Sequence, residues 1–331
     1  MPIVTVHANM RSLATSIVFA VAAIGAPLAQ AQPTATLKGH THTITTLAFA
    51  PDGKTLASGS KDESVILWNV AEKKPIATLG GHKDMVITVR FSHDSKTVAT
   101  VSHADVITLW NAVTGDKIGE LVGHKKDVRG LAFHPNGVLL ASGGIDKTVR
   151  LWDWKAKKSL HTFTQHNAEV NCVAFSPNGQ WLASGSWDRN IEVWHVATKK
   201  HHATLKGHRE FVRDLVFSPD SKVLYSSGKD GPIRIWDVAR AMPAGVLESH
   251  QGLVRALALS KDGRLLVSAG RDGTLNFWDV DKRKVIATME EGALGFQTVA
   301  FSPHGTTLAT GGIDRNVTLW NVADVLKAEN K

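Results

Sequence analysis

The sequence predicts an all-β protein built from seven repeated units, and two observations carry this prediction. Tryptophan recurs every 42 residues, at positions 68, 110, 152, 194, 236, 278 and 320, and histidine recurs with the same step at positions 40, 82, 124, 166, 208 and 250. Such a fixed period is typical of proteins in which each repeat is one supersecondary unit. Within the units, short β-branched runs such as residues 65–68 are bounded by turn residues and favour strands.

The composition is that of a folded protein with a large core. The chain has 331 residues, of which 43% are hydrophobic and 21% are charged, and these values exclude a disordered chain or a coiled coil. A chain of this size buries roughly 75% of its unfolded surface, so it needs neither disulfides nor a metal to hold its core. The single cysteine, Cys172, has no partner for an internal disulfide, and we expect it to be buried.

Residues 1–31 differ from the rest of the chain and are predicted to be a signal peptide. They contain no Asp or Glu, one basic residue at Arg11, an apolar run over residues 13–28, and the end Ala29-Gln30-Ala31. An apolar run of about sixteen residues is too short for a comfortable membrane span. We therefore expect a mature protein that starts at Gln32, has no membrane span and is periplasmic or secreted. The alternatives are an ordinary N-terminal helix or anchor, and a true start at Met10.

The local signals inside each repeat indicate four short strands and no helical period. Pro51-Asp52-Gly53 is repeated at residues 135–137, 177–179 and 303–305 with the turn residues Asn or His in the middle position. These tripeptides predict tight turns between the first two strands of a unit. Seven units of 42 residues fill almost all of residues 32–331, which we expect to form one domain.

The order of motifs in each unit is specific. A unit reads Gly-His, a strand ending in Phe-Ser-Pro-Asp-Gly or a similar sequence, Leu-Ala-Ser-Gly, an Asp, and then Trp-Asp or Trp-Asn. This order resembles the WD-repeat (WD40) family over essentially the whole of residues 32–331. The resemblance implies a single seven-bladed β-propeller with four antiparallel strands in each blade.

The two ends of the repeated region complement each other. The last unit lacks an outer strand, and residues 34–37 (Thr-Ala-Thr-Leu) resemble the outer-strand sequences at 77–79 and 203–205. We expect the N-terminal strand to pair with the last blade and close the ring, which would remove two exposed strand edges.

The resemblance also implies a hydrogen-bonded set of His, Ser or Thr, Asp and Trp inside each blade. A buried His or Asp is costly unless its polar atoms are paired, so these residue types come as a set. Five units carry the whole set: His40, Ser58, Asp62, Trp68; His124, Ser142, Asp146, Trp152; His166, Ser184, Asp188, Trp194; His208, Ser226, Asp230, Trp236; and His250, Ser268, Asp272, Trp278.

Two units depart from the set, and we expect their blades to be the less stable ones. The second keeps His82, Thr100 and Trp110 but has Ala104 in the position of the Asp, with Asp105 one place late. The seventh keeps Thr310, Asp314 and Trp320 but has Gly292 in the position of the His.

The histidines and acidic residues do not predict a metal or catalytic site. Their even spacing distributes one set to each blade, whereas a catalytic centre needs its groups to converge. The pair His201-His202, with His161 and His195 nearby, raises the question of a metal site. Adjacent residues on a strand point to opposite faces, so a solvated outer strand is the preferred interpretation. We predict no metal, no cofactor and no catalytic residues.

In the WD-repeat family the partner usually docks on the face that carries the Gly-His loops and the Asp turns, which we call the top face. Carried over by position, three side chains in each blade face outward there. Blades four to six place large apolar groups and cations at these positions, a composition typical of a binding hot spot. We call this set the aromatic–arginine patch, and it consists of Trp187, Phe211, Arg213, Lys229, Leu253, Arg255 and Arg271.

The sequence thus favours a non-catalytic protein–protein interaction scaffold of the cell envelope. Its cations favour a protein or peptide partner that carries Asp or Glu, and a monomer is expected. A formal net charge of +8 is a mild bias that indicates acidic partners rather than nucleic acid. Two alternatives stay open: a binder of polyanions or envelope glycans, and a propeller enzyme of the hydrolase or lactonase type, for which the sequence has no G-x-S-x-G motif or metal-ligand spacing.

Overall fold

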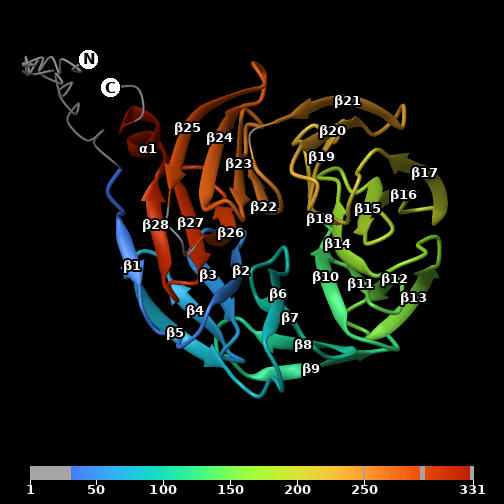
Figure 1. Cartoon of the computed structure of the whole chain (residues 1–331). Coiled ribbons are helices and arrows are strands. Elements are labelled where there is room, and N and C mark those ends of the chain that lie inside the picture. Colours follow the sequence, from blue (N-terminus) through green and yellow to red (C-terminus); the bar gives the residue numbers. More distant parts are fainter. Residues whose placement is uncertain (1–30, 249, 291–294, 329–331) are drawn as a thin grey trace, which may run out of the picture.

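Seven four-stranded antiparallel sheets stand around a central axis in the computed structural model of the chain, which describes residues 31–248, 250–290 and 295–328. Figure 1 shows the sheets as the blades of a ring, with the first and last strands side by side. The prediction of a seven-bladed β-propeller is confirmed. The predicted signal peptide, residues 1–31, lies outside the described residues except for Ala31.

The two inner strands of each blade are joined by the predicted turns. The innermost strands are β2 (Ile44–Phe49), β6 (Val86–Phe91), β10 (Val128–Phe133), β14 (Val170–Phe175), β18 (Val212–Phe217), β22 (Val254–Leu259) and β26 (Phe296–Phe301). The second strands are β3 (Thr55–Ser60), β7 (Thr97–Ser102), β11 (Leu139–Gly144), β15 (Trp181–Ser186), β19 (Val223–Gly228), β23 (Leu265–Gly270) and β27 (Thr307–Gly312).

The two outer strands complete each blade. The third strands are β4 (Val65–Asn69), β8 (Val106–Asn111), β12 (Val149–Asp153), β16 (Asn190–His195), β20 (Ile233–Asp237), β24 (Thr274–Asp279) and β28 (Val317–Asn321). The outermost strands are β5 (Lys74–Leu79), β9 (Lys117–Val122), β13 (Lys158–Phe163), β17 (Lys200–Lys206), β21 (Met242–Leu247), β25 (Lys284–Glu290) and, for the last blade, β1 (Ala35–Leu37).

The hydrophobic core lies between neighbouring blades. Buried apolar residues form clusters that each join two adjacent blades: Leu67 and Leu79 of blade one, for example, share a cluster with Val89 and Val98 of blade two. A blade therefore buries both faces only when it has a neighbour on each side.

The repeated glycine in Leu-Ala-Ser-Gly permits this close packing. A Cβ atom added to Gly59 would lie 2.7 Å from a methyl group of Val86 in the next blade, and one added to Gly143 would lie 2.5 Å from Val170. A larger residue at either position would push two blades apart, and Gly185 and Gly311 make the same close approach in their units. The equivalent positions in the second, fifth and sixth units hold Val101, Ser227 and Ala269.

The ring closes through the N-terminal strand, as the sequence predicts. Strand β1 pairs antiparallel with β28, with Leu37 opposite Val317. The backbone N–H and the hydroxyl of Thr34 both donate hydrogen bonds to the carbonyl oxygen of Leu319, at 2.8 and 2.9 Å. Leu37 is buried between blades one and seven, so both faces of the last sheet are covered.

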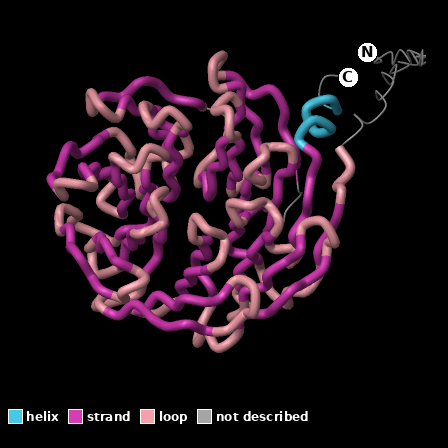
Figure 2. The backbone as a smooth tube through the Cα atoms, turned by 180° about the vertical axis from the view of Figure 1, so that it is seen from behind, coloured by secondary structure: helices cyan, strands magenta, loops and turns pink. Residues whose placement is uncertain are grey.

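One short helix was not predicted. Helix α1 (Val322–Ala328) follows the last strand and packs Val322 and Val325 against blades six and seven. Its first backbone N–H groups are capped by the side-chain oxygen of Asn321, which accepts from Ala323 N at 2.9 Å. A helix of seven residues is too short to leave a helical period in the sequence. Figure 2 shows this helix in cyan at the edge of the ring, seen from behind.

Removal of residues 32–38 tests the closure. The loss of Leu37 burial and of the β1 hydrogen bonds costs about 4 kcal/mol, which corresponds to a fall of about 10 °C in Tm for a domain of this size. Differential scanning calorimetry of the chains starting at residues 32 and 39 measures this. The exposed substitution Thr36→Ala in the same strand is the control, and an unchanged Tm after the deletion would contradict the closure.

Candidate functional site

Hydrogen-bonded chains run through the top part of the blades. In blade one, Trp68 Nε1 donates to Ser58 Oγ at 2.8 Å, Ser58 Oγ contacts His40 Nε2 at 2.8 Å, and His40 Nδ1 donates to the Asp62 carboxylate at 2.8 Å. The same connections are present in blades three, five and six, with residues His124, Ser142, Asp146, Trp152; His208, Ser226, Asp230, Trp236; and His250, Ser268, Asp272, Trp278.

The aspartates of these sets hold the top loops in place. Asp146 also accepts hydrogen bonds from the backbone N–H of Lys125 and Thr148, so one carboxylate ties the loop after His124 to the turn before β12. Burial alone would raise the pKa of Asp146, but hydrogen bonds from His124 and Lys125 outweigh it and hold that pKa far below its usual range. The carboxylate therefore stays ionised and the top face keeps a fixed shape.

Blade two has an incomplete set. His82 contacts Thr100 and Trp110 donates to Thr100, both at 2.8 Å, but Nδ1 of His82 is buried without a hydrogen-bond partner. Burial lowers the pKa of His82, which keeps the ring neutral. Asp105 is exposed and does not replace the missing carboxylate.

In blade seven, three positions of the set lie among the described residues. Trp320 donates to Thr310 at 2.9 Å, and Asp314 accepts from the backbone and side chain of Asn316. The position that holds His in other blades, Gly292, lies outside the described residues.

Blade four differs from the expected chain. His166 contacts Ser184 at 2.7 Å and Asp188 at 2.8 Å, but Trp194 Nε1 donates to Gln165 Oε1 at 3.2 Å instead of to Ser184. Gln165 stands where blades one, two, three and five have the Gly of Gly-His, and a Cβ on such a glycine lies about 3.0 Å from the Trp ring in blade one. The larger residue replaces Ser184 as the hydrogen-bond acceptor of Trp194. The change from Gly-His to Gln-His in the sequence could have predicted this difference.

Two serine substitutions compare the complete hydrogen-bonded set of blade one with the altered set of blade four. Ser58→Ala removes the partner of both Trp68 and His40, so it should lower the free energy of unfolding by about 3 kcal/mol. Ser184→Ala removes the partner of His166 only and should cost about 1 kcal/mol. Urea denaturation measures both, and equal losses would contradict the difference between the blades.

The four histidines that raised the question of a metal site, which lie on blades three and four, have separate partners. His201 contacts the Glu192 carboxylate at 2.6 Å, and His202 contacts the carbonyl oxygen of Val238 at 3.0 Å. His161 and His195 lie against the rings of Phe163 and Trp181. Within residues 31–328, apart from the undescribed positions, no group of three or more His, Cys, Asp or Glu side chains is arranged to hold a metal ion.

An aromatic pair from two blades forms the centre of the aromatic–arginine patch. The rings of Trp187 and Phe211 stack with centroids 4.5 Å apart and an interplanar angle of 18°. Trp187 remains 48% exposed although its indole N–H donates to Asn171 at 2.9 Å. Asn171 in turn donates to the carbonyl oxygen of Val212 in blade five, so the exposed ring is held rigidly across the gap between the blades.

The cations of the patch fall into two groups. Lys229 lies 5.9 Å from the Phe211 ring centroid and pairs with Glu210 at 3.7 Å. Arg213, Arg255 and Arg271 form no ion pair with any described residue. Burial lowers the pKa of Arg255, and repulsion by the neighbouring Arg213 and Arg271 lowers it further.

The patch is continuous from blade four to blade six. Leu253 is half-buried, and its carbonyl oxygen accepts a hydrogen bond from the backbone of Arg271 at 2.8 Å. Arg213 and Arg255 lie at the inner edge of the patch because they also line the central cavity. The structure thus brings a stacked aromatic pair with an exposed Trp187, and three arginines without ion pairs to described residues, to one side of the channel mouth.

The central channel contains a cavity of about 480 Å³. Cys172 lines it, and burial raises the pKa of this thiol well above its usual range, so it stays protonated. Two charged residues that were not predicted also line the cavity, Arg90 and Asp214. Alignment of the 42-residue units could have predicted Arg90 as an exception, because the equivalent positions in the other units are five Ala and one Val.

Comparison with known proteins agrees with the architecture. The repeated hydrogen-bonded sets and the ring of four-stranded blades define a WD-repeat propeller, and residues 31–69 and 73–111 match the model of the WD domain, G-beta repeat. Residues 103–325 match the family model described as the IFT122 first beta-propeller. Since this match covers more than half of the chain, the protein belongs to that propeller family.

Two curated proteins are similar to this chain over a short stretch. Small ribosomal subunit protein RACK1z of Arabidopsis thaliana and small ribosomal subunit protein RACK1 of Brassica napus are each 54% identical to this chain over 37 residues. That segment is 11% of this chain and 11% of each relative, so the match spans about a tenth of their length. Among the described residues, helices long and apolar enough to cross a membrane are absent.

Proposed function

We propose that this protein is a non-catalytic scaffold that binds an acidic segment of a partner protein on its top face, and that it acts as a monomer. WD-repeat propellers mediate protein–protein interaction, which is the general basis of the proposal. The observation that carries it for this chain is the aromatic–arginine patch, in which the exposed Trp187–Phe211 stack lies beside three arginines without carboxylate partners.

The aromatic pair supplies a rigid apolar contact. A half-exposed tryptophan is unfavourable in water, and a partner side chain that covers it gains about 25 cal/mol for each Å² of apolar surface buried. The hydrogen bond from Trp187 to Asn171 fixes the ring before binding, so little side-chain entropy is lost when a partner docks.

The arginines select the charge of the partner. Arg213 and Arg271 each repel Arg255 in the unbound protein, and a carboxylate placed among the three arginines would relieve that repulsion. Their planar guanidinium groups bind carboxylates through two parallel hydrogen bonds, so a segment rich in Asp or Glu is the favoured partner.

A polyanion or envelope glycan is the second candidate, because the same arginines would attract it. The two candidates differ in their dependence on Trp187. Binding through charge alone falls steeply with salt and does not require an aromatic contact. A docked peptide needs both the arginine charges and the contact with Trp187.

The double substitution Trp187→Ala and Phe211→Ala tests the site. Capture of partners from native extract with the chain starting at Gln32 should retain a protein that the double variant loses, with affinity reduced at least a hundredfold because the central contact is removed. Far-ultraviolet circular dichroism checks that the variant is folded.

The matched control is Ile313→Ala. Ile313 is 43% exposed and occupies in blade seven the position that Trp187 occupies in blade four. The control should bind the partner with unchanged affinity. Equal retention by the double variant would move the site elsewhere on the propeller, and retention that depends on salt but not on Trp187 would favour the polyanion.

We also propose that residues 1–31 direct export and that the mature protein, residues 32–331, is periplasmic or secreted. The support is the apolar run over residues 13–28 and the Ala29-Gln30-Ala31 end. Export would place the partner in the cell envelope or outside the cell.

Expression of the full chain in a Gram-negative host tests this proposal. The periplasmic fraction should contain a protein whose mass corresponds to a start at Gln32. Ala31→Arg should block cleavage, because the peptidase requires a small residue there. A cytoplasmic product that retains residues 1–31 would contradict export.

A further inference from the structure

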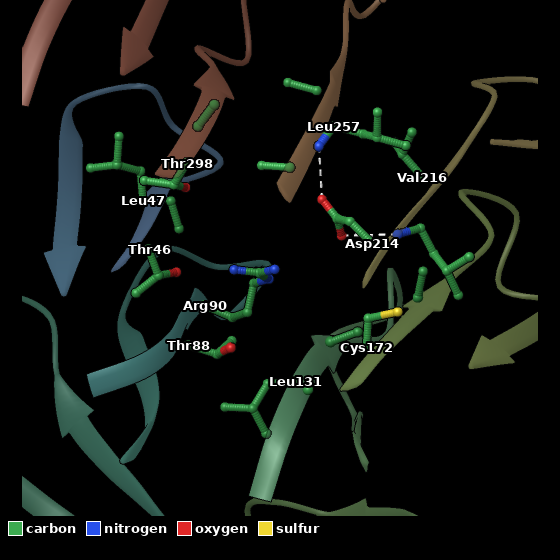
Figure 3. Close-up of a pocket in the computed structure, with 18 of the residues that line it drawn as sticks. Thr46, Leu47, Thr88, Arg90, Leu131, Cys172, Asp214, Val216, Leu257 and Thr298 are labelled. Carbon is green, nitrogen blue, oxygen red and sulfur yellow. Dashed lines mark hydrogen bonds between the residues drawn. The ribbon is translucent and has the colours of Figure 1, made fainter. Parts of the chain in front are cut away.

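A charged residue, Arg90, faces the central channel at a position where the other blades have small apolar residues. The side chains at the fifth position of the innermost strands face the cavity, and in six blades they are small: Ala48, Ala132, Ala174, Val216, Ala258 and Ala300. In blade two this position is Arg90. Figure 3 shows its guanidinium group reaching toward the middle of the cavity.

Arg90 forms one hydrogen bond to the protein and no ion pair with a described residue. One N–H of its guanidinium group donates to the carbonyl oxygen of Val89 at 2.8 Å, and no described carboxylate forms an ion pair with it. Burial lowers the pKa of Arg90, while the field of Asp214 opposes that effect. A guanidinium group deep in a protein needs hydrogen-bond acceptors. The hydrogen bond to Val89 uses one of its five N–H donors, and the residue lines the cavity.

An acidic residue lines the same cavity from the third position of an innermost strand, two residues before the position equivalent to Arg90. The equivalent positions in the other blades are Thr, Gly, Cys or Ala, and blade five alone has an acid there, Asp214. Its carboxylate accepts hydrogen bonds from the backbone N–H of Leu215 and Leu257, both at 2.9 Å (Figure 3), which fix its position between blades five and six. Burial raises the pKa of Asp214, so a nearby cation would stabilise its ionised form.

Arg90 and Asp214 interact electrostatically without forming an ion pair. Opposite charges on the wall of one cavity, held apart from each other, match a small molecule that carries both charges. A simple anion at Arg90 would be repelled by Asp214, and a simple cation at Asp214 would be repelled by Arg90 and by the arginines of the channel mouth.

We propose that the central channel binds a free α-amino acid, with its carboxylate on Arg90 and its ammonium group on Asp214. The guanidinium fork binds a carboxylate through two parallel hydrogen bonds. The alanine methyl groups and Val216 around Arg90 form an apolar wall, which favours an apolar side chain on the ligand. A cavity of about 480 Å³ accommodates such a molecule.

Isothermal titration of the chain starting at Gln32 with each of the protein amino acids, supplied singly, tests the proposal. At least one with an apolar side chain should bind saturably at micromolar to millimolar concentration. The carboxylic acid that lacks only its amino group and the amine that lacks only its carboxylate should each bind at least tenfold more weakly. If no amino acid binds, or if the acid alone binds equally well, the proposal fails.

Three variants locate the binding in the channel. Arg90→Ala introduces the residue that five blades already have at this level, so the fold should tolerate it, and Asp214→Asn keeps the shape of the side chain. Each should weaken amino-acid binding at least tenfold, with unchanged circular dichroism. Trp187→Ala should leave it unchanged, which separates this site from the aromatic–arginine patch. Unaltered binding by Arg90→Ala would place the ligand outside the channel and overturn the assignment.

Discussion

The structure depends on the packing of each blade against two neighbours. The buried clusters lie between blades, so a single sheet cannot cover its own faces and stability requires a closed ring. The close approach of Gly59 to Val86 recurs at Gly143, Gly185 and Gly311, where glycine lets neighbouring blades pack closely. Strand β1 matters for the same reason, since it supplies the last sheet with its fourth strand and places Leu37 between the first and last blades.

This arrangement frees the top face and the channel for function. The His–Asp connections hold the top loops with ionised carboxylates and leave the side chains between them available to a partner. The innermost strands are close-packed on their sides but not on the axis, where small residues leave a cavity. Residues such as Trp187 and Arg90 can therefore vary between blades without disturbing the packing that holds the ring together.

Much of the fold was predictable because each structural position occurs several times in the repeated sequence. The 42-residue step predicted the number of blades and the strand order, and the similarity of residues 34–37 to outer strands predicted the closure. The prediction for Trp194 was wrong in one contact, because Gln165 replaces a glycine that lies against the Trp ring. Helix α1 was missed because seven residues capped by Asn321 leave no periodic signal.

The sequence by itself determined the fold, since hydrophobic periodicity, turn residues and the repeated polar sets all act within one unit or between adjacent units. The tertiary structure decided which side chains from distant units meet. Trp187 and Phe211 stack because the ring places their blades next to each other, and Asn171 holds the indole ring through a contact that bridges the two blades. Arg90 and Asp214 are far apart in the chain and face one cavity only because closure of the ring brings every innermost strand to the same axis.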